Sequence, residues 1–229
     1  MKKIPVSLTK SETIWGTGYL IFEILFLPAM ISVAVLLLKL EINLASANFI
    51  YYCINFLAIL VIFRRFLLQN LDVAGARPGF TARSVLFGMA RYLILNVLAG
   101  AVVTWIAPGF MNANDAAINN MVSSNLPLMA LGTIVLVPPV EECLFRGLIF
   151  RNLHEKSRVL AYTVSTVCFA AVHLMGYLTV YTPMELLAAF IQYVPAGLCL
   201  GWAYERSGTI FAPIFIHAII NTMGIYAMR

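Results

Sequence analysis

The sequence predicts an all-α protein, a polytopic transmembrane helix bundle of about seven helices. Of its 229 residues, 62% are hydrophobic and 11% are charged, whereas soluble proteins average about 45–50% apolar and about 25% charged residues. Several apolar runs also approach the roughly 20 residues that cross the hydrocarbon core of a bilayer. The basic residues gather between these runs. Together the three observations exclude a water-soluble fold.

Seven segments are apolar and long enough to be membrane-spanning helices, although six to eight helices fit the same pattern. They cover roughly residues 14–38, 45–63, 84–107, 126–150, 159–181, 186–204 and 207–228. In the fourth segment the apolar part ends near Val140 and charged residues follow, so we expect a bent or re-entrant helix there. The two longer connections, 64–83 and 108–125, contain turn sequences such as Asn-Leu-Asp and Arg-Pro-Gly and are expected to be loops.

The net charge of +5 indicates orientation in a membrane rather than nucleic-acid binding, because the basic residues fall mainly between the apolar segments. With the N-terminus in the cytoplasm, the inner side holds Lys2, Lys3, Lys10, Arg64, Arg65, Arg77, Arg83, Arg151, Lys156, Arg158 and Arg206. Only Lys39 and Arg229 remain outside. The sequence therefore predicts an integral membrane protein with a cytoplasmic N-terminus, membrane lipid as a partner and no nucleic acid.

The chain reads as one domain, because no linker, low-complexity tract or internal repeat stands out. Two parts of the same bundle differ in their motifs and in the number of polar groups inside apolar segments. Residues 1–125 form N-terminal transmembrane helices and loops with no recognised motif. Residues 126–229 hold most of the polar groups that lie inside apolar segments.

Ionisable groups inside a bilayer are costly, about 2.5–3.5 kcal/mol each on insertion scales, so those that persist usually pair, line a wet cavity or take part in chemistry. Glu142 and Arg146 lie four residues apart and share a helix face in the favourable acid-before-base order, so this carboxylate can be neutralised locally. Glu141 is turned by about 100° from its neighbour. It is therefore the better candidate for a catalytic base.

Pro138 and Pro139 precede the two glutamates. They remove backbone donors and leave carbonyl groups upstream without partners, which a membrane tolerates only where neighbours or water satisfy them. In one interpretation, water lies near Glu141. In the other, the fourth helix ends at Val140, the prolines act as helix breakers and both glutamates lie among lipid headgroups.

Two further pairs with four-residue spacing follow. Phe169 and His173 share one helix face, and so do His217 and Asn221 in the last segment. The N–H donors of His217 and Asn221 suit the stabilisation of an oxyanion in acyl transfer. Taken singly, each pair also fits a polar contact between helices. Three helices that each bring polar groups favour one shared, partly hydrated site toward the cytoplasmic half of the bundle.

These motifs resemble those of a known family. The motifs are Glu141-Glu142-x-x-x-Arg146, Phe169-x-x-x-His173 and His217-x-x-x-Asn221. In order and spacing they look like the three motifs of the CAAX-protease and bacteriocin-processing family, known as CPBP or Abi, over roughly residues 126–226. Members of that family are intramembrane endopeptidases. One branch removes the last three residues of prenylated CAAX proteins, and others are linked to bacteriocin processing or immunity.

The resemblance implies that residues 126–229 form a CPBP-like catalytic core. By position, Glu141 and His173 would activate the attacking water, while His217 and Asn221 would stabilise the tetrahedral oxyanion. The supporting residues would be Glu142, Arg146 and Phe169. The resemblance also implies eight helices, one more than the apolar segments give. We expect the membrane to be a prokaryotic cell membrane.

The leading hypothesis is an intramembrane endopeptidase without a required cofactor, acting on a membrane-associated peptide or protein with or without a lipid anchor. Zinc held by Glu141, His173 and His217 is a weaker alternative, because no HExxH motif is present. A non-catalytic bacteriocin-immunity or regulatory protein would use the same cavity for binding. A small transporter would use Glu23 and Arg91, which fit structural pairing better.

Overall fold

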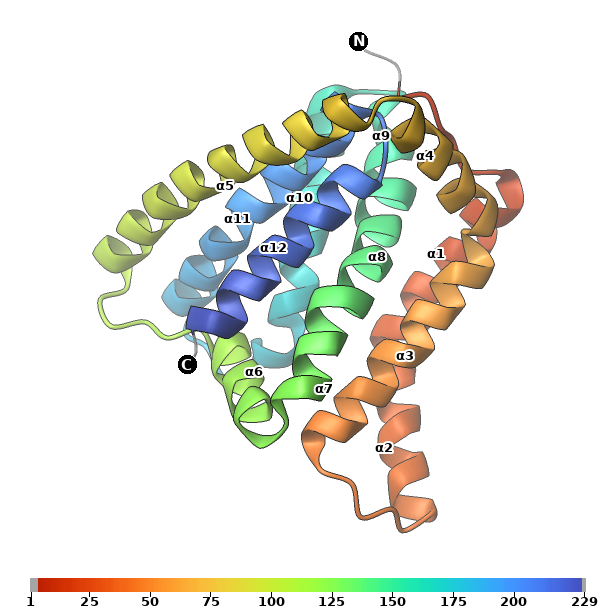
Figure 1. Ribbon diagram of the computed structural model, residues 1–229. Helices are drawn as coiled ribbons and strands as arrows, with labels where there is room; N and C mark the ends of the chain where they lie inside the picture. Colours follow the sequence, from red (N-terminus) through yellow and green to blue (C-terminus); the bar gives the residue numbers. More distant parts are fainter. Residues whose placement is uncertain (1–3, 228–229) are drawn as a thin grey trace.

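The computed structural model describes residues 4–227, which form only helices and their connections (Figure 1). The N-terminal part contains α1 (Lys10–Leu25), α2 (Leu27–Leu37), α3 (Leu44–Ile62), α4 (Arg64–Ala76), α5 (Pro78–Ile106) and α6 (Ala113–Ser124). The C-terminal part contains α7 (Leu126–Ala130), η1 (Leu131–Leu136), α8 (Val137–Glu142), η2 (Cys143–Phe150), α9 (Arg151–His154), α10 (Arg158–Leu174), η3 (Met175–Tyr177), α11 (Pro183–Ser207) and α12 (Phe211–Ala227). The predicted all-α bundle is confirmed.

Each of the seven predicted segments coincides with helical structure, but not every helix is long enough to cross a bilayer. Within residues 4–227, five helices qualify by length and composition: α3, α5, Leu126–His154, Arg158–Tyr177 and α11. A sixth span is present if α1 and α2 are one span bent by 53°. The last helix, α12, is apolar but has only 17 residues.

The bend between α1 and α2 has a local cause. Pro28 lies in the first turn of α2, where it offers no backbone N–H to continue the hydrogen bonding of α1. The first predicted segment is therefore two helices rather than one.

The connections 64–83 and 108–125 are largely helical, so the prediction of loops there is wrong. In α4, the buried Asn70 accepts a hydrogen bond from the Ile210 N–H at 2.8 Å and so ties this helix to the start of α12. At the start of α6, the Asn112 side chain accepts from the Asn114 N–H at 3.0 Å. Asparagine side chains here cap or join helices, a use that competes with turn formation.

The fourth predicted segment is one helical stretch, Leu126–His154, with two widened turns at η1 and η2. Pro138 and Pro139 lie inside this stretch, at the start of α8, where they offer no N–H to the preceding turn. The interpretation in which the helix ends at Val140 is wrong. Glu142 and Arg146 are completely buried inside the bundle rather than placed among headgroups.

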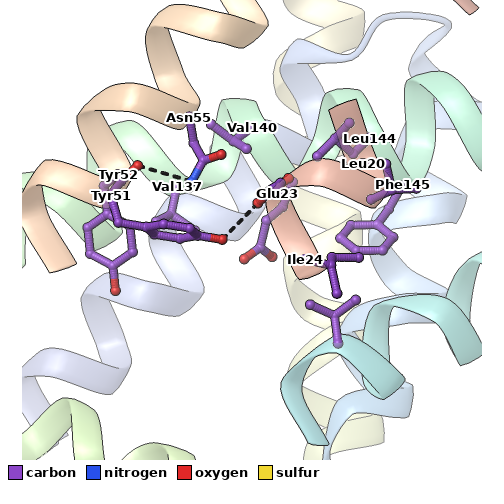
Figure 2. Close-up of a pocket in the computed structure, with 12 residues that line it drawn as sticks. Leu20, Glu23, Ile24, Tyr51, Tyr52, Asn55, Val137, Val140, Leu144 and Phe145 are labelled. Atoms are coloured by element: carbon purple, nitrogen blue, oxygen red, sulfur yellow. Dashed lines mark hydrogen bonds between the residues drawn. The ribbon is translucent and has the colours of Figure 1, made fainter. Parts of the chain in front are cut away.

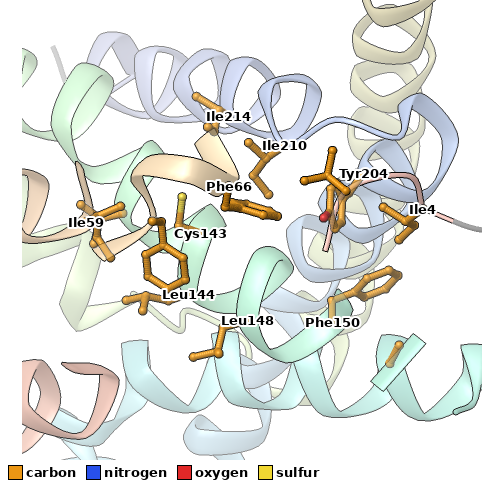
Figure 3. Close-up of a cluster of buried hydrophobic side chains, with 14 residues drawn as sticks. Ile4, Ile59, Phe66, Cys143, Leu144, Leu148, Phe150, Tyr204, Ile210 and Ile214 are labelled. Carbon is orange, nitrogen blue, oxygen red and sulfur yellow. The ribbon is translucent and has the colours of Figure 1, made fainter. Parts of the chain in front are cut away.

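An apolar core packs against this segment (Figure 3). Phe66 of α4, Phe150 of η2 and Tyr204 of α11 are each fully buried within it, and the last two rings lie 6.2 Å apart between centroids. This packing fixes the stretch that carries Arg146 relative to α11.

The basic residues predicted to be cytoplasmic gather at one end of the bundle. In Figure 1, α4 and α9 lie together at this end, which places Arg64, Arg65 and Arg151 there, and Arg151 donates to the Ile4 carbonyl near the start of the described chain. Lys2, Lys3 and Arg229 lie outside the described residues. The grouping agrees with the predicted sidedness, and the compartment that this end faces stays a prediction.

Candidate active site

A buried ion pair lies at the centre of the polar cluster. Glu142 and Arg146 are both 0% exposed, with 3.2 Å between Nε and Oε2 and 3.3 Å between Nη1 and Oε1. The guanidinium also donates to the Gly197 carbonyl of α11 at 3.4 Å and lies 4.5 Å from the centre of the Phe169 ring. The local neutralisation of Glu142 expected from the four-residue spacing is present.

His217 of α12 lies between two consecutive carboxylates. Its Nδ1 is 2.8 Å from Oε1 of Glu142, and its Nε2 is 3.8 Å from Oε2 of Glu141. The imidazole is buried. Because Glu142 holds Nδ1, the nitrogen that faces Glu141 is Nε2.

Glu141 has different surroundings from its neighbour. Its side chain is 21% exposed, and its Oε2 has no hydrogen-bond partner among the described residues. It lines a cavity of about 80 Å³, together with the apolar side chains Val137, Val140, Leu144, Phe145 and Val172. A carboxylate with a free lone pair beside a cavity that can hold water is able to accept a proton from that water.

The proline pair determines what Asn221 contacts. The Val137 N–H bonds to the Gly132 carbonyl, and Pro138 has no N–H, so the Thr133 carbonyl is left without a partner in its own helix. Asn221 of α12 donates to this carbonyl through Nδ2 at 2.7 Å. A carbonyl freed by proline therefore anchors a predicted site residue.

His173 of α10 is joined to the cluster through Phe169. Its Nδ1 lies 2.8 Å from the Phe169 carbonyl, which can only accept, so Nδ1 carries the proton and Nε2 keeps a lone pair. The Phe169 ring lies 4.8 Å from the His173 ring and 5.9 Å from that of His217, between centroids. The structure thus brings Glu141 and His217 together directly, and His173 to them across this aromatic ring.

An acidic residue that the sequence analysis did not select lies near His173. Asp115 of α6 is exposed. Partial desolvation by the neighbouring protein still raises the pKa of its carboxyl group.

The opposite wall of the cavity comes from the N-terminal helices, which the sequence analysis left without a role (Figure 2). It consists of Leu20, Glu23 and Ile24 of α1 and Tyr51, Tyr52 and Asn55 of α3. The Tyr51 hydroxyl donates to Oε1 of Glu23 at 3.1 Å. The sequence did hold one sign of this wall, because Glu23 is an acidic residue within the first apolar segment.

Arg91 is not part of this wall. Its guanidinium lies 3.9 Å from the centre of the Trp202 ring and donates to the Phe87 carbonyl. Glu23 and Arg91 each make a structural contact, but not with each other: Glu23 bonds to Tyr51, and Arg91 lies over Trp202.

The three side chains considered for zinc do not form a metal site as they stand. Within residues 4–227, no three His, Cys, Asp or Glu side chains are arranged to hold a metal ion. Phe169 separates His173 from His217. The donor set of Glu141, His173 and His217 therefore does not fit the ion in this arrangement.

Fold and site together define a class of protein. A membrane-type helical bundle encloses a glutamate that lines a small cavity and faces the imidazole of His217, while Asn221 is held on the Thr133 carbonyl and His173 on that of Phe169. Groups able to move protons and to donate hydrogen bonds are typical of a hydrolytic centre. The class is that of a polytopic membrane hydrolase.

Comparison with known proteins shows what the chain is similar to. A family model described as "Type II CAAX prenyl endopeptidase Rce1-like" matches residues 123–223, which include every residue of the three motifs. The chain is also 29% identical over 189 residues to a Bacillus subtilis (strain 168) protein described as "Putative membrane peptidase YdiL", over 79% of this chain and 72% of that protein. No solved structure matches. Over its C-terminal part the chain is therefore similar to the CPBP family, and the two matches together support a membrane protease.

Proposed function

We propose that this protease hydrolyses a peptide bond of a membrane-associated substrate by means of a water molecule that Glu141 activates. The observation that carries the proposal is the contrast between the two adjacent glutamates. Glu142 is paired with Arg146 at 3.2 Å and with His217 at 2.8 Å, whereas Glu141 borders the cavity and has the Nε2 of His217 at 3.8 Å. Glu141 is therefore the carboxylate that remains available to take a proton.

In the proposed reaction, the water oxygen attacks the scissile carbonyl carbon while one water proton passes to Glu141. The carbonyl oxygen becomes an oxyanion, which accepts hydrogen bonds from Asn221 and, when its ring carries both protons, from Nε2–H of His217. The C–N bond then breaks and the proton on Glu141 passes to the leaving nitrogen. The products are a carboxylic acid and an amine.

The remaining residues hold these groups in place. Glu142 fixes the ring of His217 through Nδ1, and Arg146 holds Glu142 while it also contacts α11 and Phe169. His173 is held through Nδ1 by the Phe169 carbonyl, so Nε2 is the nitrogen that remains available to accept a hydrogen bond. Such positioning matters because a displacement of about 1 Å can cost roughly 100-fold in rate.

The substrate that we propose is a peptide or protein at the membrane, either CAAX-like or a peptide precursor. The location of the site inside a helical bundle supports a membrane-associated substrate, and the description of the matching family model supports a CAAX-like one. We also propose a prokaryotic cell membrane, with the N-terminus and the site toward the cytoplasm.

The test uses the purified full chain in liposomes with internally quenched peptides, prenylated and unprenylated. Glu141→Gln should lower kcat by at least about 100-fold while the protein inserts and unfolds as the wild type does. Glu185→Gln is the matched control, because Glu185 is a partly exposed acid in the first turn of α11, outside the site, and it should keep full activity. Normal turnover by Glu141→Gln would refute the mechanism and favour a binding role for the cavity.

A further inference from the structure

Two carboxylates from distant parts of the chain line the same cavity. Glu23 comes from α1 and Glu141 from α8. Glu23 is only 9% exposed, and Tyr51 donates to its Oε1. The Oε2 atoms of both glutamates are buried and have no hydrogen-bond partner among the described residues. A buried polar atom without a partner is costly, so both oxygens call for a donor.

The described residues that line the cavity bring no positive charge to Glu23 and Glu141. Among the described residues that line the cavity, the titratable ones are Glu23, Glu141, Tyr51 and Tyr52, and none is basic. Close to this wall, the Tyr19 hydroxyl of α1 is used in a hydrogen bond to Asn55 at 2.6 Å.

Basic groups lie only on the other side of Glu141. His217 faces it from α12, and Arg146 is engaged with Glu142. Leu144 and Phe145 of η2 and Val172 of α10 close the remaining sides with apolar groups. Within residues 4–227, the protein therefore donates no hydrogen bond to the buried Oε2 atom of either lining carboxylate.

The cavity has the size for such a donor. Its volume of about 80 Å³ exceeds the roughly 10–15 Å³ that one water molecule needs by the same kind of measure. A water molecule has two O–H donors, and the cavity presents two acceptors without partners. Water held by both carboxylates would direct its oxygen lone pairs away from them.

We propose that Glu23 is a positioning residue of the reaction, which accepts a hydrogen bond from the same cavity water that Glu141 activates. The inference rests on the proposed function of Glu141. Only Glu141 takes the proton of the attacking water, and Glu23 holds the second O–H so that the oxygen faces the substrate carbonyl. Tyr51 holds Glu23 in turn through the hydrogen bond to Oε1.

The experiment measures kcat and KM against pH for the full chain in liposomes. Glu23→Gln keeps the shape and an acceptor oxygen but removes the charge, so kcat should fall about 10-fold with KM unchanged. The acidic limb of the kcat profile should move to lower pH by about one unit, because a neighbouring negative charge is lost beside the base. Glu23→Leu removes the acceptor as well and should lower kcat by about 100-fold.

Two further variants separate positioning from structure. Glu12→Gln makes the same chemical change in the same helix, but Glu12 accepts hydrogen bonds from Thr9 and from the Phe66 N–H at 2.8 Å. Glu12→Gln should lower the free energy of unfolding but leave the pH profile of kcat unchanged. Tyr51→Phe removes the hydrogen bond to Glu23 without a change of charge, so kcat should fall several-fold with the acidic limb unmoved.

The outcomes distinguish this inference from the proposed function. If Glu23→Gln has the wild-type kcat and profile while Glu141→Gln is inactive, Glu23 does not position the water and the proposed function stands. If Glu141→Gln turns over normally, the proposed function itself fails. The isosteric Glu23→Gln variant decides the matter even where Glu23→Leu does not insert.

Discussion

Replacing Arg146 by methionine should destabilise the folded protein by about 3–5 kcal/mol, because it leaves Glu142 buried without its counter-charge. At the observed Nε–Oε2 distance of 3.2 Å, an effective dielectric constant of about 20 gives an attraction of about 5 kcal/mol. Methionine fills much of the same space. His217 remains as a contact of Glu142 but does not replace a guanidinium that also bonds to α11.

The measurement is the free energy of unfolding in mixed detergent micelles. Arg158→Met is the matched control, because Arg158 is 57% exposed and pairs with Glu205 at 2.9 Å, so its loss should cost less than about 1 kcal/mol. The double variant Glu142→Gln with Arg146→Met should be more stable than Arg146→Met alone, since no buried charge is left unpaired. A cost for Arg146→Met no greater than that for Arg158→Met would refute the reasoning.

Three further substitutions test the local geometry. Pro138→Ala restores a backbone N–H that competes with Asn221 for the Thr133 carbonyl. In steady-state assays kcat should fall about 10-fold at unchanged KM. An unchanged kcat would contradict the role of the proline in placing Asn221. Gly197→Ala places a Cβ 2.5 Å from Cγ2 of Thr166 and should cost about 1–3 kcal/mol in unfolding experiments; wild-type stability would show that α10 and α11 can separate freely. Gly75→Ala, with nothing within 4 Å of the new Cβ, should instead stabilise α4 by about 0.5–1 kcal/mol, and a loss of stability would argue against the helical assignment.

Features that depend on local spacing could be predicted from the sequence. The Glu142–Arg146 pair follows from a four-residue repeat within one helix. The apolar segments gave the positions of the long helices, because about 20 apolar residues are needed whatever the tertiary packing. The roles assigned to Glu141, His173, His217 and Asn221 stay predictions that the activity assays test.

Features that depend on how helices pack could not be predicted. Nothing in the sequence indicates that Glu23, more than a hundred positions earlier, shares a cavity with Glu141, because either face of an almost wholly apolar helix can turn inward. The prolines indicated a freed carbonyl, but a neighbouring side chain or water could equally satisfy it, and only the fold shows that Asn221 does so. The sequence Asn-Leu-Asp predicts a turn at Asn70, because the contact that ties this residue to Ile210 depends on a neighbour from another helix.

The cavity has one wall from α1 and α3 and another from α8, η2 and α10. The proposed proton acceptor lies on the second wall, so substitutions along the first wall that keep Glu23 and Tyr51 can reshape what fits without moving it. Relatives that share the C-terminal motifs can therefore diverge in preference through the other residues of their first sixty. Exchanging that stretch between two such proteases, with Glu23 and Tyr51 kept, should transfer selectivity while the turnover chemistry stays with the recipient.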